Sequence, residues 1–209
     1  MRKLVIGDKN LSSWSLRPWL ALSVAGIEFE EIGIRLGRPG TRAEILRHSP
    51  SGKVPCLIDD DLVVWDSLAI CEYAAEISPT LWPTDTASRA LARAVSAEMH
   101  SGFTALRQAM PMEICAAKPG AGRSPEVDAD IARIVALWES CRARSVAMGK
   151  AGPFLFGAFS IADAMFAPVI WRFATYAVAL PPAAQAWADA MRALPAMQAW
   201  HAAARAEVG

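Results

Sequence analysis

The sequence has few residues with which to bind a metal or form disulfides. Its 209 residues include only four cysteines and three histidines, scattered along the chain with no Cys-x-x-Cys pair. Neither a zinc site nor a disulfide framework is therefore predicted, and we expect no bound metal. Each cysteine lies in an apolar stretch, which favours a small buried side chain over a redox role. The four are Cys56, Cys71, Cys115 and Cys141.

The chain also lacks a net charge and a long apolar run. Its 21 basic and 21 acidic residues cancel, and the isoelectric point is near 6.8, so nothing favours a nucleic acid or an anionic membrane surface as a partner. No segment approaches the roughly 20 apolar residues of a membrane span. The start of the chain reaches Gly7 and Asp8 after too few apolar positions for a signal peptide. We therefore expect a cytoplasmic protein that binds neither membranes nor nucleic acid.

What the sequence has in abundance is apolar side chains. Hydrophobic residues make up 54% of the chain and charged residues 20%, with eight tryptophans. This composition excludes a disordered chain. A chain of this length buries a substantial core, either as one large domain or as two small ones.

The N-terminal part alternates between strand and helix patterns. Short apolar runs rich in β-branched residues predict strands, and helical spacing between them predicts helices. The strands are expected at 3–7, 29–36, 54–61 and 62–65, the last two as a hairpin. The helices are expected at 15–26, 41–49 and 66–78. This order predicts an α/β unit with a mixed sheet whose faces are covered by helices.

A change of composition marks a second part of the chain. Two prolines punctuate residues 79–85, and from there Ala, Leu, Met, Arg and Trp recur at helical spacing. We therefore expect a first domain at 1–80, a linker at 81–87 and an all-helical domain at 88–209. The helices of this second domain are expected at about 88–110, at about 126–148, from 160 onward, and as two shorter segments after that.

Ser160 and Asp163 form a helix-start signal within the stretch FSIADAMFAPV. A serine followed three residues later by an acid is typical of a capping box, in which the two side chains satisfy free backbone N–H groups. We expect this pair to fix the start of a central apolar helix, and we assign no catalytic role to Asp163.

Three stretches together resemble the cytosolic glutathione transferase family. They are SSWSLRPWLAL, GKVPCLIDDDLVVWDSLAICEYAAE and FSIADAMFAPV, and the resemblance covers essentially the whole chain. The sequence is most similar to the zeta-like, serine-type branch with its signature Ser-Ser-Cys-Ser-x-Arg, in which Trp14 here replaces the cysteine. The resemblance implies a thioredoxin-like domain with a mixed four-stranded sheet, an all-helical second domain, a homodimer, and glutathione as co-substrate.

The resemblance also implies where catalysis takes place. Pro18 suits a first helical turn, which predicts a helix start near Trp14 or Ser15 and leaves Ser12 and Ser13 in the preceding loop. A helix N-terminus favours an anion, so a glutathione thiolate held there can accept a serine O–H hydrogen bond. The family's catalytic serine matches Ser12, with Ser13 as second choice. The alternative is that these serines only cap the helix.

Five further residues match the family's glutathione-binding positions. Family members have the proline of KVPCL in cis, so Pro55 would present the Val54 backbone to the cysteinyl part of glutathione, with Lys53 near the glycyl carboxylate. In WDSLAI, Ser67 opens a helix that can hold the γ-glutamyl carboxylate, while Asp66 takes the ammonium. The family more often has Glu or Gln where Asp66 stands. From the residues alone, an edge proline, a solvated lysine and a plain helix cap are the alternatives.

Three functions follow from this resemblance. The first is a glutathione S-transferase that activates the glutathione thiol for conjugation to a small hydrophobic electrophile. The second is a glutathione-dependent cis-trans isomerase of the maleylacetoacetate or maleylpyruvate type, against which Trp14 in place of the cysteine counts. The third is a binding module with the same fold and no turnover, because fold does not establish activity.

Overall fold

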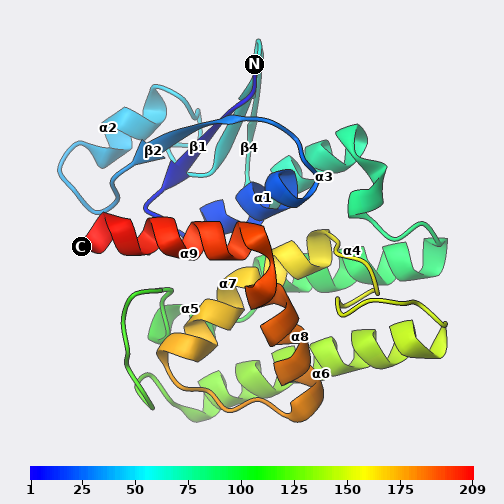
Figure 1. The fold of residues 1–209 in the computed structure, drawn as a ribbon. Coiled ribbons are helices and arrows are strands. Elements are labelled where there is room, and N and C mark those ends of the chain that lie inside the picture. The colour runs from blue at the N-terminus through cyan, green and yellow to red at the C-terminus, as the bar shows by residue number, and fades with distance from the viewer.

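The N-terminal part of the chain is a four-stranded sheet flanked by helices (Figure 1). The computed structural model describes all residues, 1–209. Strand β1 is central: it pairs in parallel with β2 and antiparallel with β3, and β3 pairs antiparallel with β4. The predicted mixed sheet is thus confirmed, in the order β2-β1-β3-β4. The strands are β1 Lys3–Gly7, β2 Glu30–Ile34, β3 Cys56–Asp59 and β4 Leu62–Trp65.

Alternation along β1 determines what each face of the sheet packs against. Leu4 and Ile6 belong to the large apolar cluster that includes α1 and α3, whereas Val5 packs with Ile45 of α2 on the opposite face. Two helices therefore separate the sheet from the rest of the molecule, and the third covers its outer face. These helices are α1 Ser13–Val24, α2 Thr41–Leu46 and α3 Ser67–Ile77.

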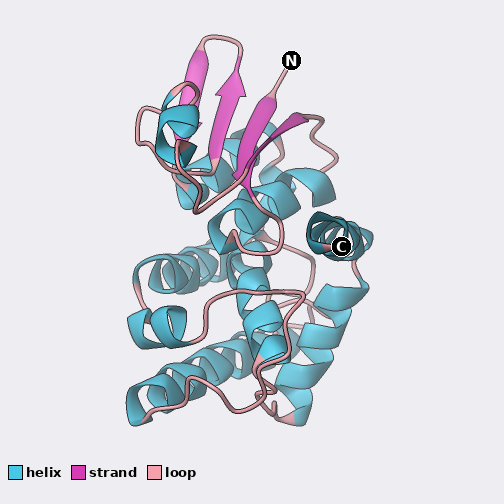
Figure 2. Ribbon diagram, turned by 90° about the vertical axis from the view of Figure 1, so that its left-hand side faces the viewer, coloured by secondary structure: helices cyan, strands magenta, loops and turns pink.

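The C-terminal part is built from helices (Figure 2). Helix α7 lies at its centre and is buried along its whole length except at Ala174. None of the helices combines the length and the apolar character that a membrane span needs. After the 3-10 turn η1 Pro79–Leu81, the helices are α4 Thr86–Ser101, α5 Thr104–Ala109, α6 Pro125–Ala147, α7 Ile161–Thr175, α8 Pro182–Ala193 and α9 Pro195–Val208.

The two parts of the chain share one core. Helix α1 packs against both α3 and α7, and α4 packs against α7 as well. One cluster of 49 buried apolar residues therefore runs from the sheet into the helical part. Because α1 carries the predicted catalytic serines at its start, the helical part fixes the orientation of those serines.

The loop between β1 and α1 is held by segments from the far end of the chain. The Lys9 carbonyl oxygen accepts a hydrogen bond from Trp200 Nε1 at 2.9 Å. The Asn10 N–H donates to Glu207 Oε2 at 3.2 Å, and the Asn10 side-chain oxygen accepts from the Cys115 N–H at 2.9 Å. Helix α9 and the α5–α6 loop thus hold in place the loop that leads into α1.

The single helix predicted at about 88–110 is wrong, because the chain breaks between α4 and α5. The Gly102 N–H closes α4 by donating to the Glu98 carbonyl oxygen at 2.8 Å. Phe103 then adopts a left-handed conformation with φ 59°, which a helix cannot contain. The apolar spacing continues through this break because both helices bury side chains in the same core, so periodicity alone cannot reveal it.

Helix α1 also starts earlier than predicted. It begins at Ser13 rather than at Trp14 or Ser15, with Ser12 as the N-cap whose oxygen accepts the Ser15 N–H. Pro18 therefore lies in the second turn, where its missing N–H removes one backbone hydrogen bond of the helix. The N-terminal cap, and not the proline, determines where this helix begins.

One of the four cysteines departs from the expected burial. Cys56, Cys71 and Cys141 are buried and free, as expected, but Cys115 is exposed. It lies in the loop between α5 and α6, where Met112 and Ile114 are buried but Cys115 is not, so the local composition was misleading.

The division into domains at 1–80 and 88–209 stays a prediction. The structure places η1 at the end of the first segment and begins α4 at Thr86, with Asp85 as its N-cap. The first turn of α4 therefore overlaps the expected linker at 81–87.

The predicted capping box is confirmed at the start of α7. Asp163 is fully buried and accepts the Ser160 N–H at 2.9 Å and the Ser160 hydroxyl at 3.0 Å. Its other oxygen accepts from the Leu155 N–H and from Trp187 Nε1, each at 2.9 Å. Asp163 thus joins α7, α8 and the loop before α7, and its role is structural.

Replacing Asp163 by alanine is expected to lower the free energy of unfolding by about 3 kcal/mol, because four buried donors lose their acceptor. Urea denaturation followed by tryptophan fluorescence measures this change. Asp189→Ala removes an exposed carboxylate of α8 that pairs with Arg192 and serves as the control, with a change below about 0.5 kcal/mol. Equal losses in both variants would contradict the capping role.

Candidate functional site

A cavity of about 650 Å³ opens where the end of the sheet meets α1, α3 and α4. It brings together all five residues predicted to bind glutathione. Residues from the loop between α2 and β3, from α1, from β4 and from α4 complete its wall. Its lining residues are Trp14, Ser51, Lys53, Val54, Pro55, Trp65, Asp66, Ser67 and His100.

Val54 presents free backbone groups to this cavity. The Val54–Pro55 peptide bond is cis, and strand β3 begins only at Cys56. The Val54 N–H and C=O form no hydrogen bond with another backbone group of the protein. Since backbone polar groups require partners, these two are available to an extended peptide laid along the cavity.

The N-terminus of α3 forms the polar end of the cavity. Asp66 caps the helix, its Oδ1 accepting the Leu68 N–H at 2.9 Å and the Ala69 N–H at 3.1 Å. Asp66 is held at φ 77°, a conformation that an aspartate adopts only under local constraint. The Ser67 hydroxyl is buried and has no hydrogen-bond partner. A free hydroxyl at a helix N-terminus suits a bound carboxylate.

His100 reaches this end of the cavity from α4 in the helical part. Its Nε2 lies 3.2 Å from Asp66 Oδ2, and its Nδ1 is buried without a partner. Burial lowers the pKa of His100, Arg17 and Arg107 lower it further, and Asp66 alone opposes them. The sequence analysis missed His100, because only the packing of α4 beside α3 brings it to Asp66.

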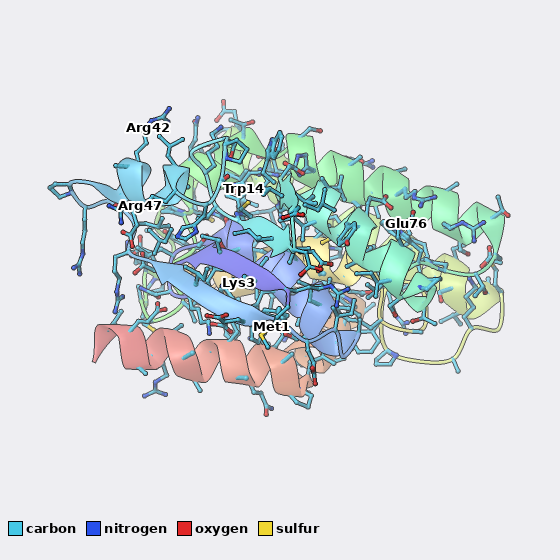
Figure 3. The ribbon with its side chains drawn as sticks, turned by 90° about the horizontal axis from the view of Figure 1, so that it is seen from above. Met1, Lys3, Trp14, Arg42, Arg47 and Glu76 are labelled. Carbon is cyan, nitrogen blue, oxygen red and sulfur yellow. The ribbon has the colours of Figure 1, made fainter.

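Trp14 separates the cavity from two arginine side chains. Its ring is 36% exposed and lies near α4 (Figure 3), where it meets the His100 ring edge-on at a centroid distance of 5.4 Å. The Cζ atoms of Arg17 and Arg107 lie 4.3 and 4.8 Å from the Trp14 ring centroid, within cation–π range. The position where the zeta-like signature has a cysteine is thus an aromatic platform with no thiol.

Neither predicted catalytic serine lines the cavity, although Ser13 directly precedes Trp14 in the sequence. Ser12 is 5% exposed, and its hydroxyl donates to Ser15 Oγ at 2.7 Å. Ser13 is 8% exposed, and its Oγ accepts from Arg172 Nη2 at 3.1 Å. Their catalytic role stays a prediction, as does the binding role of the five cavity residues.

Comparison with known proteins identifies the family. The family model described as the N-terminal domain of glutathione S-transferase matches residues 11–77, and the model of its C-terminal domain matches residues 86–203. The chain belongs to the glutathione S-transferase family. The two matches together span both parts of the fold described above.

The curated relatives of this family member include isomerases as well as transferases. A probable maleylacetoacetate isomerase of Caenorhabditis elegans is 32% identical over 105 residues, which are 49% of either chain. The maleylacetoacetate isomerase of Rattus norvegicus is 36% identical over 101 residues, 46% of this chain and 47% of the relative. The matches therefore span about half the length of these relatives.

Solved structures confirm the two-part transferase fold. A glutathione transferase from Methylococcus capsulatus has a TM-score of 0.71 at 25% identity, with 99% of this chain and 100% of that chain covered. A diazinon-metabolizing glutathione S-transferase from the silkworm Bombyx mori has a TM-score of 0.74 at 19% identity, with both chains covered fully at 100%. The predicted fold, a thioredoxin-like domain followed by helices, is thus confirmed.

Asp66→Asn is expected to lower the pKa of His100 further, because the substitution removes the only neighbouring charge that raises it. Asparagine preserves an oxygen that can cap α3, so folding should persist. An NMR titration of the histidine ring protons in both proteins measures the shift. The signal of His201, on α9, should titrate identically in both, and an unmoved His100 signal would rule out its pairing with Asp66.

Proposed function

We propose that this protein is a glutathione S-transferase that activates the glutathione thiol for conjugation to a small hydrophobic electrophile. The observation that carries the proposal is the single cavity lined by Lys53, Val54, Pro55, Asp66 and Ser67. Residues from two separate sequence stretches, each matching a glutathione-binding position of the family, converge there.

Each part of glutathione finds a chemical partner in this cavity. The γ-glutamyl carboxylate fits the N-terminus of α3 and the free Ser67 hydroxyl, and its ammonium group fits Asp66. The cysteinyl backbone pairs with the free N–H and C=O of Val54. The exposed ammonium of Lys53 suits the glycyl carboxylate at the other end.

The chemistry requires the thiol to ionise and then to attack. A serine hydroxyl at the start of α1 donates to the sulfur and, with the helix dipole, favours the thiolate, while the thiol proton passes to solvent. Lowering a thiol pKa from about 8.5 to about 6.5 takes roughly 2.7 kcal/mol. The thiolate then forms a C–S bond to the electrophilic carbon, aided by the orientation that the cavity imposes.

The first test is the ultraviolet thiolate absorbance of bound glutathione, titrated against pH. The proposal expects a thiol pKa about two units below that of a free cysteine-like thiol. Binding with an unshifted pKa would favour a binding module without turnover. No binding at all would reject the assignment of the cavity.

Ser67→Ala is expected to weaken glutathione binding about tenfold, which corresponds to one lost hydrogen bond to a carboxylate. Isothermal titration calorimetry measures the dissociation constant. Ser140→Ala removes an exposed serine of α6 whose hydroxyl donates to the Leu137 carbonyl oxygen, and this control should bind as the wild type does. Equal affinity in both variants would place the γ-glutamyl carboxylate elsewhere.

The isomerase reading is a second candidate, favoured by the names of the worm and rat relatives. An isomerase adds the thiol transiently and releases it again, whereas a transferase consumes glutathione. A cis dicarbonyl acid offered with glutathione distinguishes them: turnover with glutathione conserved indicates the isomerase, and loss of free thiol into a conjugate indicates the transferase.

Membership of the family also supports two proposals about the protein in the cell. We propose that it is a homodimer and that it works in the cytoplasm. Light scattering of the purified protein tests the first, because a mass of twice 22.5 kDa is expected. Cell fractionation tests the second.

A further inference from the structure

Three arginines gather where α1 meets the helical part, and no carboxylate pairs with any of them. Arg17 and Arg172 are buried, at 2% and 7% exposure, and Arg107 is half-buried. The ion pairs of the protein include none of the three. Arg17 Nε and Nη1 and Arg107 Nε are buried without a hydrogen-bond partner. Asp66 raises the pKa of Arg17 and Asp130 raises that of Arg107, but neither carboxylate forms an ion pair with them. The group therefore still favours a further anion nearby.

The three cations repel one another. Burial and the charge of Arg107 lower the pKa of Arg17 to about 9, and the same two causes lower the pKa of Arg172 to about 10. A negative charge placed beside the group would relieve this repulsion, so the start of α1 is a favourable place for a thiolate.

Arg172 connects this group to one of the two candidate serines. Its Nη2 donates to Ser13 Oγ at 3.1 Å, and its Nη1 donates to the backbone carbonyl oxygens of Met110 and Arg107. Helix α7 thereby holds the guanidinium against the first residue of α1. Of the two serines, only Ser13 has a side-chain hydrogen bond to the helical part.

The two serines differ in whether their hydroxyl protons have an acceptor within the protein. The Ser12 hydroxyl donates to Ser15 Oγ, and Ser15 Oγ also accepts the Gly7 N–H, so Ser12 is part of a network within the N-terminal part. Ser13 Oγ accepts from Arg172 and donates to no group of the protein. Its proton is therefore free for an incoming acceptor, and accepting from a cation makes a hydroxyl a stronger donor.

We propose that Ser13 is the hydroxyl that donates to the glutathione thiolate, and that Arg172 is a positioning residue that orients and polarises it. The inference rests on the proposed function and identifies the group that carries it out. The S–H bond breaks heterolytically, its electron pair stays on sulfur and its proton goes to solvent. Arg17 and Arg107 add positive potential without contacting the sulfur.

The experiment is the pH titration of thiolate absorbance for bound glutathione in Ser13→Ala, Arg172→Met and the double variant. Each single variant is expected to raise the thiol pKa by about one unit. The thiol pKa of the double variant should exceed that of Ser13→Ala by clearly less than Arg172→Met alone raises it, because Arg172 acts through Ser13. Arg172→Lys retains the charge and should restore part of the shift.

A control separates this effect from loss of structure. Arg133→Met removes an exposed arginine of α6 that pairs with Glu98, and its thiol pKa should equal that of the wild type. At about pH 5, where the bound thiol is protonated in both proteins, the glutathione dissociation constant of Ser13→Ala should stay within about twofold of the wild type, since this serine is not among the residues proposed to hold the peptide. Should Arg172→Met fail to fold, Ser13→Ala still tests the serine, and Arg172→Lys, with a thiol pKa expected between those of the wild type and Ser13→Ala, tests the arginine.

The outcomes are distinct. The inference is overturned if the thiol pKa is lowered equally in the wild type and in Ser13→Ala but returns to that of free glutathione in Ser12→Ala. The proposed function then stays in place. A wild-type thiol with the pKa of free glutathione overturns both. Full additivity of Ser13→Ala and Arg172→Met overturns the role of Arg172 through Ser13.

Discussion

The packing of α1 against α7 is the contact on which the rest of the structure depends. Helix α7 is buried almost completely, and it packs against α1, α4 and α8. Its start is fixed by Asp163 and its end carries Arg172, so one rigid element spans the distance from the core of the helical part to the start of α1. Because the sheet rests on α1 and α3, the cavity between sheet and helices has a defined width only while this contact holds.

This arrangement is costly, which indicates that it serves more than folding. Burying a guanidinium without an anionic partner opposes folding, and three of them lie close together here. The Trp14 ring compensates in part by stacking against two of them. A cysteine at position 14 would offer no such surface, so the change from the zeta-like signature and the neighbouring arginines belong to one arrangement.

The sequence allowed prediction of those features whose cause is local. Strand β1 and the Ser160–Asp163 pair each depend on residues within a few positions, and they were found from those residues. The five cavity residues lie in two short stretches that match the family, so their convergence was expected as well.

Features that depend on tertiary packing were not found. The contact of His100 with Asp66 joins residues of different parts of the chain, and the break at Phe103 lies inside an uninterrupted apolar spacing. The second-turn position of Pro18 follows from where Ser12 caps the helix, which the spacing of the prolines does not show. The hydrogen bond from Arg172 to Ser13 spans most of the chain, and no local pattern signals it.

The hydrogen bonds from α9 to the loop after β1 affect the order in which the parts of the protein can fold. Trp200 and Glu207 are synthesised 191 and 197 residues after their partners Lys9 and Asn10. A nascent chain on the ribosome can pair its strands early, but the loop before α1 lacks two of its hydrogen-bond partners until α9 has emerged. The segment that leads into α1 therefore gains its full set of hydrogen bonds only once α9 has packed against it, late in the folding of the chain.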